Sequence, residues 1–251
     1  MSNKILVIGD SCLDEFVYCH CERLCPEAPV PVLDIISKVS NGGMAANVAE
    51  NLASLGVNGE LITNTDFQSF TKTRYVEFKT NHMFCRIDSK KRVDRITGLQ
   101  SINLNEFAAI IISDYDKGFL YPEDIKYISE NHPITFLDSK SRIGDWAKNV
   151  TFIKINEKEY NQSKDYIDSN LHDRCIVTLG EKGAKLGDRV FPTKQVDIMD
   201  LSGAGDSFLA GLVVKFLVSG GNIEEGIKFA NECAASVVSK RGVSKISGLR
   251  A

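Results

Sequence analysis

The sequence predicts an α/β fold in which parallel strands alternate with helices. The first observation is the apolar run KILVIGD at 4–10, which ends in Gly9 and Asp10, as buried parallel strands do before a ligand-facing loop. The same pattern recurs in AAIIISD at 108–114, ITFLD at 134–138, TFIKIN at 151–156 and CIVTLG at 175–180. The second observation is helical periodicity over residues 44–55, 122–131, 205–219 and 223–239. Gly56 ends the first of these helices, and Pro122 begins the second.

The polar or glycine residues that end these strands predict where a ligand binds. Parallel α/β sheets bind ligands outside the carboxyl ends of their strands, an edge that we call the rim. The residues expected to gather there are Asp10, Asp114, Asp138, Asn156 and Gly180. We therefore expect the chemistry of this protein at the rim.

Two regions do not follow the pattern of alternating strands and helices. The first is VPVLDIIS at 30–37, and the second is the pair RYVEFKT at 74–80 and MFCRIDS at 83–89. The pair alternates with period two and predicts a β-hairpin joined by Asn81 and His82. With residues 15–20 these stretches predict a small β-sheet lid, formed from about 15–37 and 74–89. Because no linker or repeat interrupts the chain, we expect a single domain over residues 1–251.

Composition narrows the class of protein and its partners. The 251 residues are 43% apolar and 25% charged, with a formal net charge of −3, so neither disorder nor a surface for nucleic acid is expected. No run approaches the roughly 18 apolar residues of a membrane span, and the first apolar run is too short for a signal peptide. We expect a cytoplasmic protein without a membrane partner. Its seven cysteines form no regular framework, which favours reduced thiols.

The stretch YCHCERLC at 18–25 brings four potential metal ligands together, namely Cys19, His20, Cys21 and Cys25. In an extended segment Cys19 and Cys21 face one way and His20 the other. Common zinc knuckles also need a distant second pair of ligands, and none follows in the sequence. We therefore expect reduced thiols of the lid here, with no metal bound.

The strongest chemical signal is DLSGAGDSFLAGL at 200–212. Gly203, Ala204 and Gly205 are small enough to let a phosphate approach the backbone, and the helix that follows offers free N–H groups at its positive end. Asp206 at this helix start would ordinarily repel an anion. Its carboxylate is useful there if it takes a proton from a hydroxyl that attacks a phosphoryl group. From this stretch alone, it is an equal alternative that Asp206 has no catalytic role and only offsets the helix dipole.

Together with this motif, further stretches resemble the ribokinase-like, PfkB-type carbohydrate kinases, and most of all the kinase domain of the heptose 7-phosphate kinases. The resemblance covers nearly the whole chain and is carried by ILVIGDSCLDEF, PEAPVPVLDI, NGGMAANVAENLASLGV, KTRYV with FCRID, SDYDKG, LDSK, INEKE, VTLGEKGA and DLSGAGDSFLAG. It implies a ribokinase-like three-layer α/β/α sandwich with a mainly parallel sheet. It also implies transfer of the γ-phosphoryl group of ATP to a sugar hydroxyl.

The resemblance implies roles for the residues at matching positions. Asp206 would be the catalytic base, beside an anion hole formed by Gly203, Ala204 and Gly205. ATP would bind near Asn156, Glu159, Thr178, Gly180 and Gly183, and Glu159 would act on Mg²⁺ through water. The sugar would bind near Asp14, Gly42, Gly43, Asn47, Arg86, Asp114, Asp138 and Lys140. From the residues alone, NGGMAAN and TLGEKG are equally compatible with ordinary turns.

The expected substrate is a sugar phosphate, heptose 7-phosphate, and the expected product is heptose 1,7-bisphosphate. The phosphate dianion needs cationic partners, for which the candidates are Arg74, Arg86, Lys117 and Arg142. ATP and Mg²⁺ are the implied cofactors, and a monovalent cation at the anion-hole loop is left open. The exposed edge of a lid also leaves room for a homodimer.

The sequence departs from these kinases between LITNTD at 61–66 and KTRYV at 72–76, where only residues 67–71 intervene. Such kinases usually carry a longer segment there, with a helix and a strand. The resemblance therefore does not predict the edge of the main sheet or the substrate specificity. The alternatives are a ribokinase-like kinase for another sugar or a nucleoside, and a catalytically silent regulator that binds sugar or nucleotide. Because the chain ends soon after the last predicted helix, no fused nucleotidyltransferase domain is expected.

Overall fold

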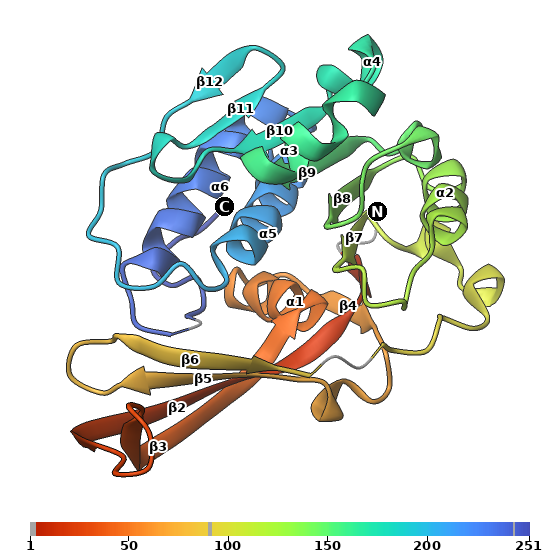
Figure 1. Ribbon diagram of the computed structural model, residues 1–251. Helices are drawn as coiled ribbons and strands as arrows, with labels where there is room; N and C mark the ends of the chain where they lie inside the picture. Colours follow the sequence, from red (N-terminus) through yellow and green to blue (C-terminus); the bar gives the residue numbers. More distant parts are fainter. Residues whose placement is uncertain (1–3, 90–91, 243) are drawn as a thin grey trace.

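A computed structural model describes residues 4–89, 92–242 and 244–251, and its main sheet has eight strands within these residues (Figure 1). Their order is β12-β11-β10-β9-β8-β7-β1-β4. The six parallel strands are β1 (Ile5–Gly9), β4 (Gly59–Ile62), β7 (Ala109–Asp114), β8 (Thr135–Ser139), β9 (Phe152–Asn156) and β10 (Cys175–Thr178). Beyond β10 the sheet continues antiparallel through β11 (Ala184–Leu186) and β12 (Arg189–Phe191).

Helices cover both faces of this sheet. On β1, Ile5 and Val7 point into a core shared with three helices: α1 (Ala45–Ser54), α5 (Ala204–Val218) and α6 (Ile223–Val238). Leu6 and Ile8 point to the opposite core, onto which the chain packs α2 (Pro122–Asn131), α3 (Glu157–Ser163) and α4 (Ser169–His172). Continuous apolar runs form these strands because both of their faces are buried. The predicted three-layer α/β/α sandwich is confirmed.

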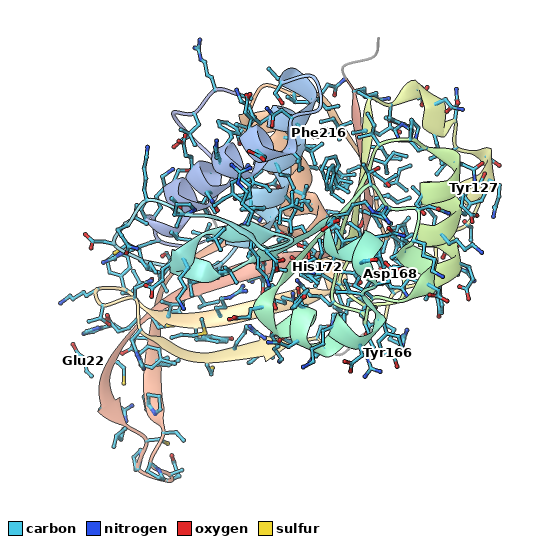
Figure 2. The ribbon with its side chains drawn as sticks, turned by 90° about the horizontal axis from the view of Figure 1, so that it is seen from above. Glu22, Tyr127, Tyr166, Asp168, His172 and Phe216 are labelled. Atoms are coloured by element: carbon cyan, nitrogen blue, oxygen red, sulfur yellow. The ribbon has the colours of Figure 1, made fainter. Side chains whose placement is uncertain are left out.

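A second sheet forms the predicted lid and has the order β3-β2-β5-β6. Its strands are β2 (Ser11–Leu24), β3 (Pro31–Met44), β5 (Thr71–Glu77) and β6 (Met83–Asp88). A single residue, Asp10, separates the end of β1 from the start of β2, so the lid starts directly at the rim. Figure 2 shows Glu22 on the part of the lid that extends away from the main sheet.

The five main-sheet strands and four helices predicted from the sequence form within one or two residues of the predicted ends. The lid, predicted from about 15–37 and 74–89, extends further, over residues 11–44 and 71–88, because β2 and β3 pair along almost their whole length. The predicted two-residue turn of the lid hairpin is wrong, because the connection runs over residues 78–82. The Glu77 carboxylate accepts hydrogen bonds from the backbone N–H groups of Lys79 and Thr80 there, which stabilises the longer turn. The short strands β4, β11 and β12 were not predicted from the sequence.

The short segment noted in the sequence forms one 3₁₀ turn, Phe67–Ser69, between β4 and β5. β4 is therefore the edge strand of the main sheet, and the chain passes from it straight into the lid. Further 3₁₀ turns lie at Leu99–Ser101, Leu104–Glu106, Asp145–Ala147, Lys164–Tyr166 and Gly180–Lys182.

The cysteine-rich stretch lies on β2 and in the turn that follows it. Cys19 is fully buried, whereas Cys21 and Cys25 are partly exposed, and His20 lies between the carboxylates of Glu22 and Glu77. Among the described residues, no group of three or more His, Cys, Asp or Glu side chains is placed to hold a metal ion. Throughout residues 4–89, 92–242 and 244–251, no helix is long and apolar enough to cross a membrane.

Candidate active site

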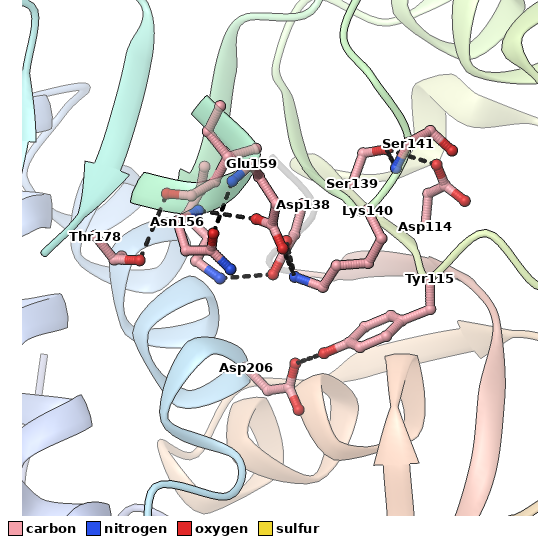
Figure 3. A network of polar contacts seen from close by, with 12 residues as sticks. Asp114, Tyr115, Asp138, Ser139, Lys140, Ser141, Asn156, Glu159, Thr178 and Asp206 are labelled. Atoms are coloured by element: carbon pink, nitrogen blue, oxygen red, sulfur yellow. Dashed lines mark hydrogen bonds and ion pairs between the residues drawn. The ribbon is translucent and has the colours of Figure 1, made fainter. Parts of the chain in front are cut away.

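The carboxylate of Asp206 lies buried at the start of α5, with 6% of the residue exposed. Asn47 Nδ2, from α1, donates a hydrogen bond to Oδ2 at 2.8 Å. The Tyr115 hydroxyl donates one to Oδ1 at 2.7 Å, which Figure 3 shows. Burial raises the pKa of Asp206, and these two hydrogen bonds oppose that rise. The site therefore holds a carboxylate whose ionised form depends on two specific donors.

The loop before Asp206 packs against a buried ammonium group. Gly203, with a φ of 80°, starts α5, and a Cβ atom at Gly205 would lie 2.8 Å from Lys154 Nζ. Glycine at 205 thus allows the backbone to approach Lys154 closely. A helix N-terminus and a buried cation together favour an anion at this loop. This geometry suits the anion hole predicted at Gly203, Ala204 and Gly205.

Four charged side chains form a network on the rim (Figure 3). Lys154 on β9 lies directly opposite Asp138 on β8, and its Nζ is 2.6 Å from Asp138 Oδ2. Lys140 Nζ bridges Asp138 Oδ1 at 3.2 Å and Glu159 Oε1 at 2.8 Å. Burial alone would raise the pKa of Asp138, but the Lys154 and Lys140 charges lower it. Asp138 and Lys140, both predicted to bind sugar, thus bind each other.

Asn156 and Glu159 form a reciprocal cap at the start of α3. The Glu159 N–H donates to Asn156 Oδ1 at 2.9 Å, and the Asn156 N–H donates to Glu159 Oε2 at 2.8 Å. The cap fixes the Glu159 carboxylate, which also pairs with Lys140, at the rim. The INEKE motif therefore has a structural role besides its predicted contact with the nucleotide.

A largely apolar pocket of about 170 Å³ opens beside the anion-hole loop. It is lined by Thr178, Gly180 and Gly183, three residues predicted to bind ATP, and by Ala204 and Gly205 of the predicted anion hole. Its apolar wall comes from Val196, Ile198, Leu201, Phe208, Ala234 and Val238. An apolar pocket that ends at a candidate phosphate site has the chemistry of a nucleotide site.

On the lid side, Asp14 is bound by Arg74 of β5, whose Nη1 lies 2.7 Å from Asp14 Oδ1. The Arg74 guanidinium also lies over the Phe16 ring, 4.9 Å from its centroid. A Cβ atom at Gly43 would lie 2.6 Å from Asp14 Oδ2, so only glycine lets β3 approach this carboxylate. Gly42 and Gly43 lie just before Met44, the last residue of β3, and Asn47 follows on α1. Of these residues, Asn47 contacts Asp206 directly.

The structure does not bring two of the predicted sugar residues into this cluster. Arg86 lies on β6 and pairs with its neighbour Asp88 on the surface, at 2.7 and 2.9 Å. The Asp114 carboxylate holds the loop that follows β7, since it accepts hydrogen bonds from Asp116 N and Ser139 Oγ. Asp114 therefore stabilises the backbone of the rim and is not directed at the cluster around Asp206.

Two residues of the site were missed from the sequence. Tyr115 follows the predicted rim residue Asp114, and its hydroxyl reaches Asp206. Lys154 is almost fully buried within β9. A lysine inside the apolar run TFIKIN was a usable signal, because a charge in a buried strand needs a partner. Tyr115 gave no such signal.

Comparison with known proteins identifies relatives of this chain. The family model of the pfkB family carbohydrate kinases matches residues 131–247. The protein named bifunctional protein HldE from Helicobacter pylori is 33% identical over 295 residues, which cover 95% of this chain and 63% of that protein. The HldE protein of Campylobacter jejuni is 30% identical over 97% of this chain. This chain spans 63% of the length of both relatives, and each alignment is longer than its 251 residues, so both carry segments that it lacks.

Solved structures share the fold over nearly the whole chain. The nucleoside kinase of Methanocaldococcus jannaschii, a member of the ribokinase family, has a TM-score of 0.71 and 19% identity, with 99% of this chain and 95% of that chain covered. The ribokinase of Arabidopsis thaliana, solved with ribose and ATP, has a TM-score of 0.70 and 14% identity, with 100% and 96% covered. These likenesses confirm the ribokinase-like fold. Within this chain, residues 131–247 carry the match to the pfkB family carbohydrate kinases, and the curated relatives extend the likeness over 95% or more of the chain.

Proposed function

We propose that this chain is an ATP-dependent sugar kinase in which Asp206 activates the acceptor hydroxyl. The observation that carries the proposal is the position of Asp206 between two candidate sites. Ala204 and Gly205, directly before Asp206, line the apolar pocket, and Asn47, which follows Gly42 and Gly43 in the chain, binds the Asp206 carboxylate. A buried base between a nucleotide and an alcohol is the arrangement that phosphoryl transfer needs.

In the proposed reaction, a sugar hydroxyl gives its proton to Asp206 while its oxygen attacks the γ-phosphorus of ATP. The bond to the β-phosphate oxygen breaks and ADP leaves. The free N–H groups at the start of α5 stabilise the negative charge on the phosphoryl oxygens, and Lys154 adds a buried positive charge beside them. In the proposed cycle the lid closes over the rim and limits the access of water, which would otherwise compete for the phosphoryl group.

Mg²⁺ is the metal that this reaction implies. Each oxygen of the Glu159 carboxylate has one protein partner, Lys140 Nζ or Asn156 N, and retains capacity for a water molecule. The residues thus fit Mg²⁺ that arrives with ATP and contacts Glu159 through water, since Mg²⁺ keeps several waters and binds substrate phosphates. When bound, Mg²⁺ neutralises charge on the phosphates.

For the acceptor we propose a sugar phosphate, with heptose 7-phosphate converted to heptose 1,7-bisphosphate. The resemblance to heptose 7-phosphate kinases and the HldE relatives support this choice. Two lysines near the lid side could receive the phosphate: Lys72 on β5 and Lys117 in the loop after β7. Neither forms a salt bridge with a described acidic residue, whereas Arg74, proposed from the sequence, is engaged with Asp14.

We further propose that residues 1–251 act as one kinase domain in the cytoplasm, where ATP is the donor. The lid carries exposed apolar side chains, among them Ile35, Ile36, Met83 and Ile87. A second copy of the chain that covers these side chains would give a homodimer through the lid.

The test is an ADP-release screen over heptose 7-phosphate, fructose phosphates, ribose and nucleosides, run with the wild-type protein and Asp206→Asn. We expect heptose 7-phosphate to stimulate ADP release most. Asp206→Asn should lower kcat by about 10²- to 10⁴-fold with little change in KM, because it removes the base and keeps the shape. Differential scanning fluorimetry of the variant serves as the folding control.

The other outcomes separate the alternatives. Stimulation by ribose or a nucleoside alone would replace the heptose assignment and keep the kinase. Ligands that raise the melting temperature without any sugar-stimulated ADP release would favour the silent binding protein. Stimulation that persists unchanged in Asp206→Asn would remove Asp206 from the role of base.

A further inference from the structure

Tyr115 joins the loop after β7 to the buried carboxylate of Asp206. Its hydroxyl donates a 2.7 Å hydrogen bond to Asp206 Oδ1, and its backbone N–H donates a 2.7 Å hydrogen bond to Asp10 Oδ2. The same Asp10 carboxylate accepts hydrogen bonds from the N–H groups of Phe119 and Lys117, at 3.2 and 3.4 Å. Asp10 therefore fixes the loop, and the loop fixes where the phenol points.

The ring of Tyr115 is also held by cations. Lys140 Nζ of the rim network lies 5.1 Å from the ring centroid, and Lys72 Nζ of the lid lies 5.2 Å from it. Both distances lie in the range of cation–π contacts. Figure 3 shows Lys140 and Tyr115 directed into the same space, with the phenol oxygen at Asp206. Tyr115 thus lies where the lid, the rim and the candidate base meet.

A buried carboxylate with no donors would be neutral near pH 7 and could not accept a proton. Asp206 has two donors, and they bind different oxygens, Asn47 at Oδ2 and Tyr115 at Oδ1. Each carboxylate oxygen offers two lone-pair positions, so one position on each oxygen remains for a substrate hydroxyl. The two donors also set the plane of the carboxylate, which decides the direction from which a hydroxyl can approach.

We propose that Tyr115 is a positioning residue of the kinase, which holds the Asp206 carboxylate ionised and aimed at the acceptor hydroxyl. The proposal rests on the sugar kinase function proposed above. Tyr115 keeps its own proton throughout, because the sugar hydroxyl supplies the proton that Asp206 takes up.

The direction of the pH effect follows from the groups that surround Asp206. Burial and the Asp138 charge on β8 raise the pKa of Asp206, whereas the donors Asn47 and Tyr115 and the Lys154 charge on β9 lower it. The Cys12 thiol on β2 also lies close enough to interact, and burial raises its pKa to about 12, so it stays neutral. Loss of the Tyr115 hydroxyl removes stabilisation of the ionised form. The pKa of Asp206 then rises, and the acidic limb of activity moves to higher pH.

The experiment compares wild type with Tyr115→Phe and with Tyr127→Phe as the matched control. Tyr127 lies on α2 at the outer side of the molecule, and the same substitution there leaves the site untouched (Figure 2). We expect Tyr115→Phe to lower kcat at neutral pH by roughly tenfold and to move the acidic limb of the kcat profile to higher pH. Tyr127→Phe should keep both unchanged.

A second readout needs no turnover. Carboxyl ¹³C NMR, with the Asp206 signal assigned through Asp206→Asn, follows the ionisation of Asp206 in wild type and Tyr115→Phe. A higher pKa of Asp206 in Tyr115→Phe supports the proposal, whether or not a sugar in the screen is phosphorylated. If no sugar is phosphorylated, the proposed function fails, and the role of Tyr115 is still tested by this titration. The role of Tyr115 is overturned if the pKa of Asp206 is unchanged in Tyr115→Phe, or if the acidic limb of its kcat profile stays at the wild-type pH.

Discussion

The rim and the outer strand of the lid, β6, hold their charged residues in opposite ways. On the rim, the side chains of Asp138 and Lys154 are 1% and 4% exposed and pair with each other. On the lid, the Arg86 side chain is 49% exposed, and its partner Asp88 is a neighbour on the same strand. Buried pairs in a low dielectric have strong, directed interactions, whereas exposed pairs contribute little. The comparison indicates a preorganised rim and an adaptable outer strand of the lid, whereas the buried pair of Asp14 and Arg74 nearer the site resembles the rim pair.

The rim and the tip of the lid hairpin are also held in place by different kinds of contact. The rim residues end or follow strands at the centre of the main sheet, so their backbones are fixed by hydrogen bonds on both sides. The tip of the lid hairpin is held by side chains: Asn81 Nδ2 donates to the Met199 carbonyl, and Arg241 donates to the carbonyls of Phe78 and Lys79, each at 2.9 Å. Met199 lies within the segment that lines the pocket. We therefore expect rim substitutions to affect stability and kcat, and lid substitutions to affect sugar binding.

The largest effect is expected at Lys154. Lys154→Met leaves the buried Asp138 with Lys140 as its only cation, so the free energy of unfolding should fall by about 3 kcal/mol in urea denaturation. The double variant Asp138→Leu/Lys154→Met removes both charges and should recover part of the loss. If Lys154→Met alone is as stable as wild type, the rim is not held by this pair.

An intermediate effect is expected at Arg74. Arg74→Met releases Asp14 and should raise the KM for sugar by roughly tenfold while the KM for ATP stays constant, because Asp14 lies on the lid side of the site. Arg86, directly opposite Arg74 on β6, offers a matched control, and Arg86→Met should change the KM for sugar by less than about twofold. A large effect of Arg86→Met would instead support the substrate role predicted from the sequence.

The smallest effect is expected at the tip of the lid. Asn81→Ala and Arg241→Ala remove the side-chain hydrogen bonds that hold the hairpin, so hydrogen exchange of residues 77–83 should become faster. The KM for sugar should rise roughly two- to tenfold. Arg250→Ala, at an exposed position near the end of the chain, is the control. Exchange that stays at the wild-type rate would show that other contacts hold the tip of the hairpin.

Much of the fold and part of the site could be predicted because the signals are local. Apolar runs that end in Asp, Asn or Gly predicted the strands and the rim, and Gly203 to Asp206 indicated a phosphate-binding helix start. The short strands β4, β11 and β12 were missed, since three or four residues carry too little periodicity to identify a strand. The lid turn was misplaced because the Glu77 carboxylate stabilises a longer connection.

The sequence by itself determined the class of fold, the order of its elements and the position of Asp206 at a helix start. Only the tertiary structure decided which groups surround that carboxylate. Asn47 and Tyr115 lie 159 and 91 residues from Asp206 along the chain. Contacts at such separations depend on how strands and helices pack, and no local pattern of residues encodes them. For the same reason, Asp138 and Lys140 looked like sugar ligands in the sequence and form an ion-paired network with Lys154 and Glu159 in the fold.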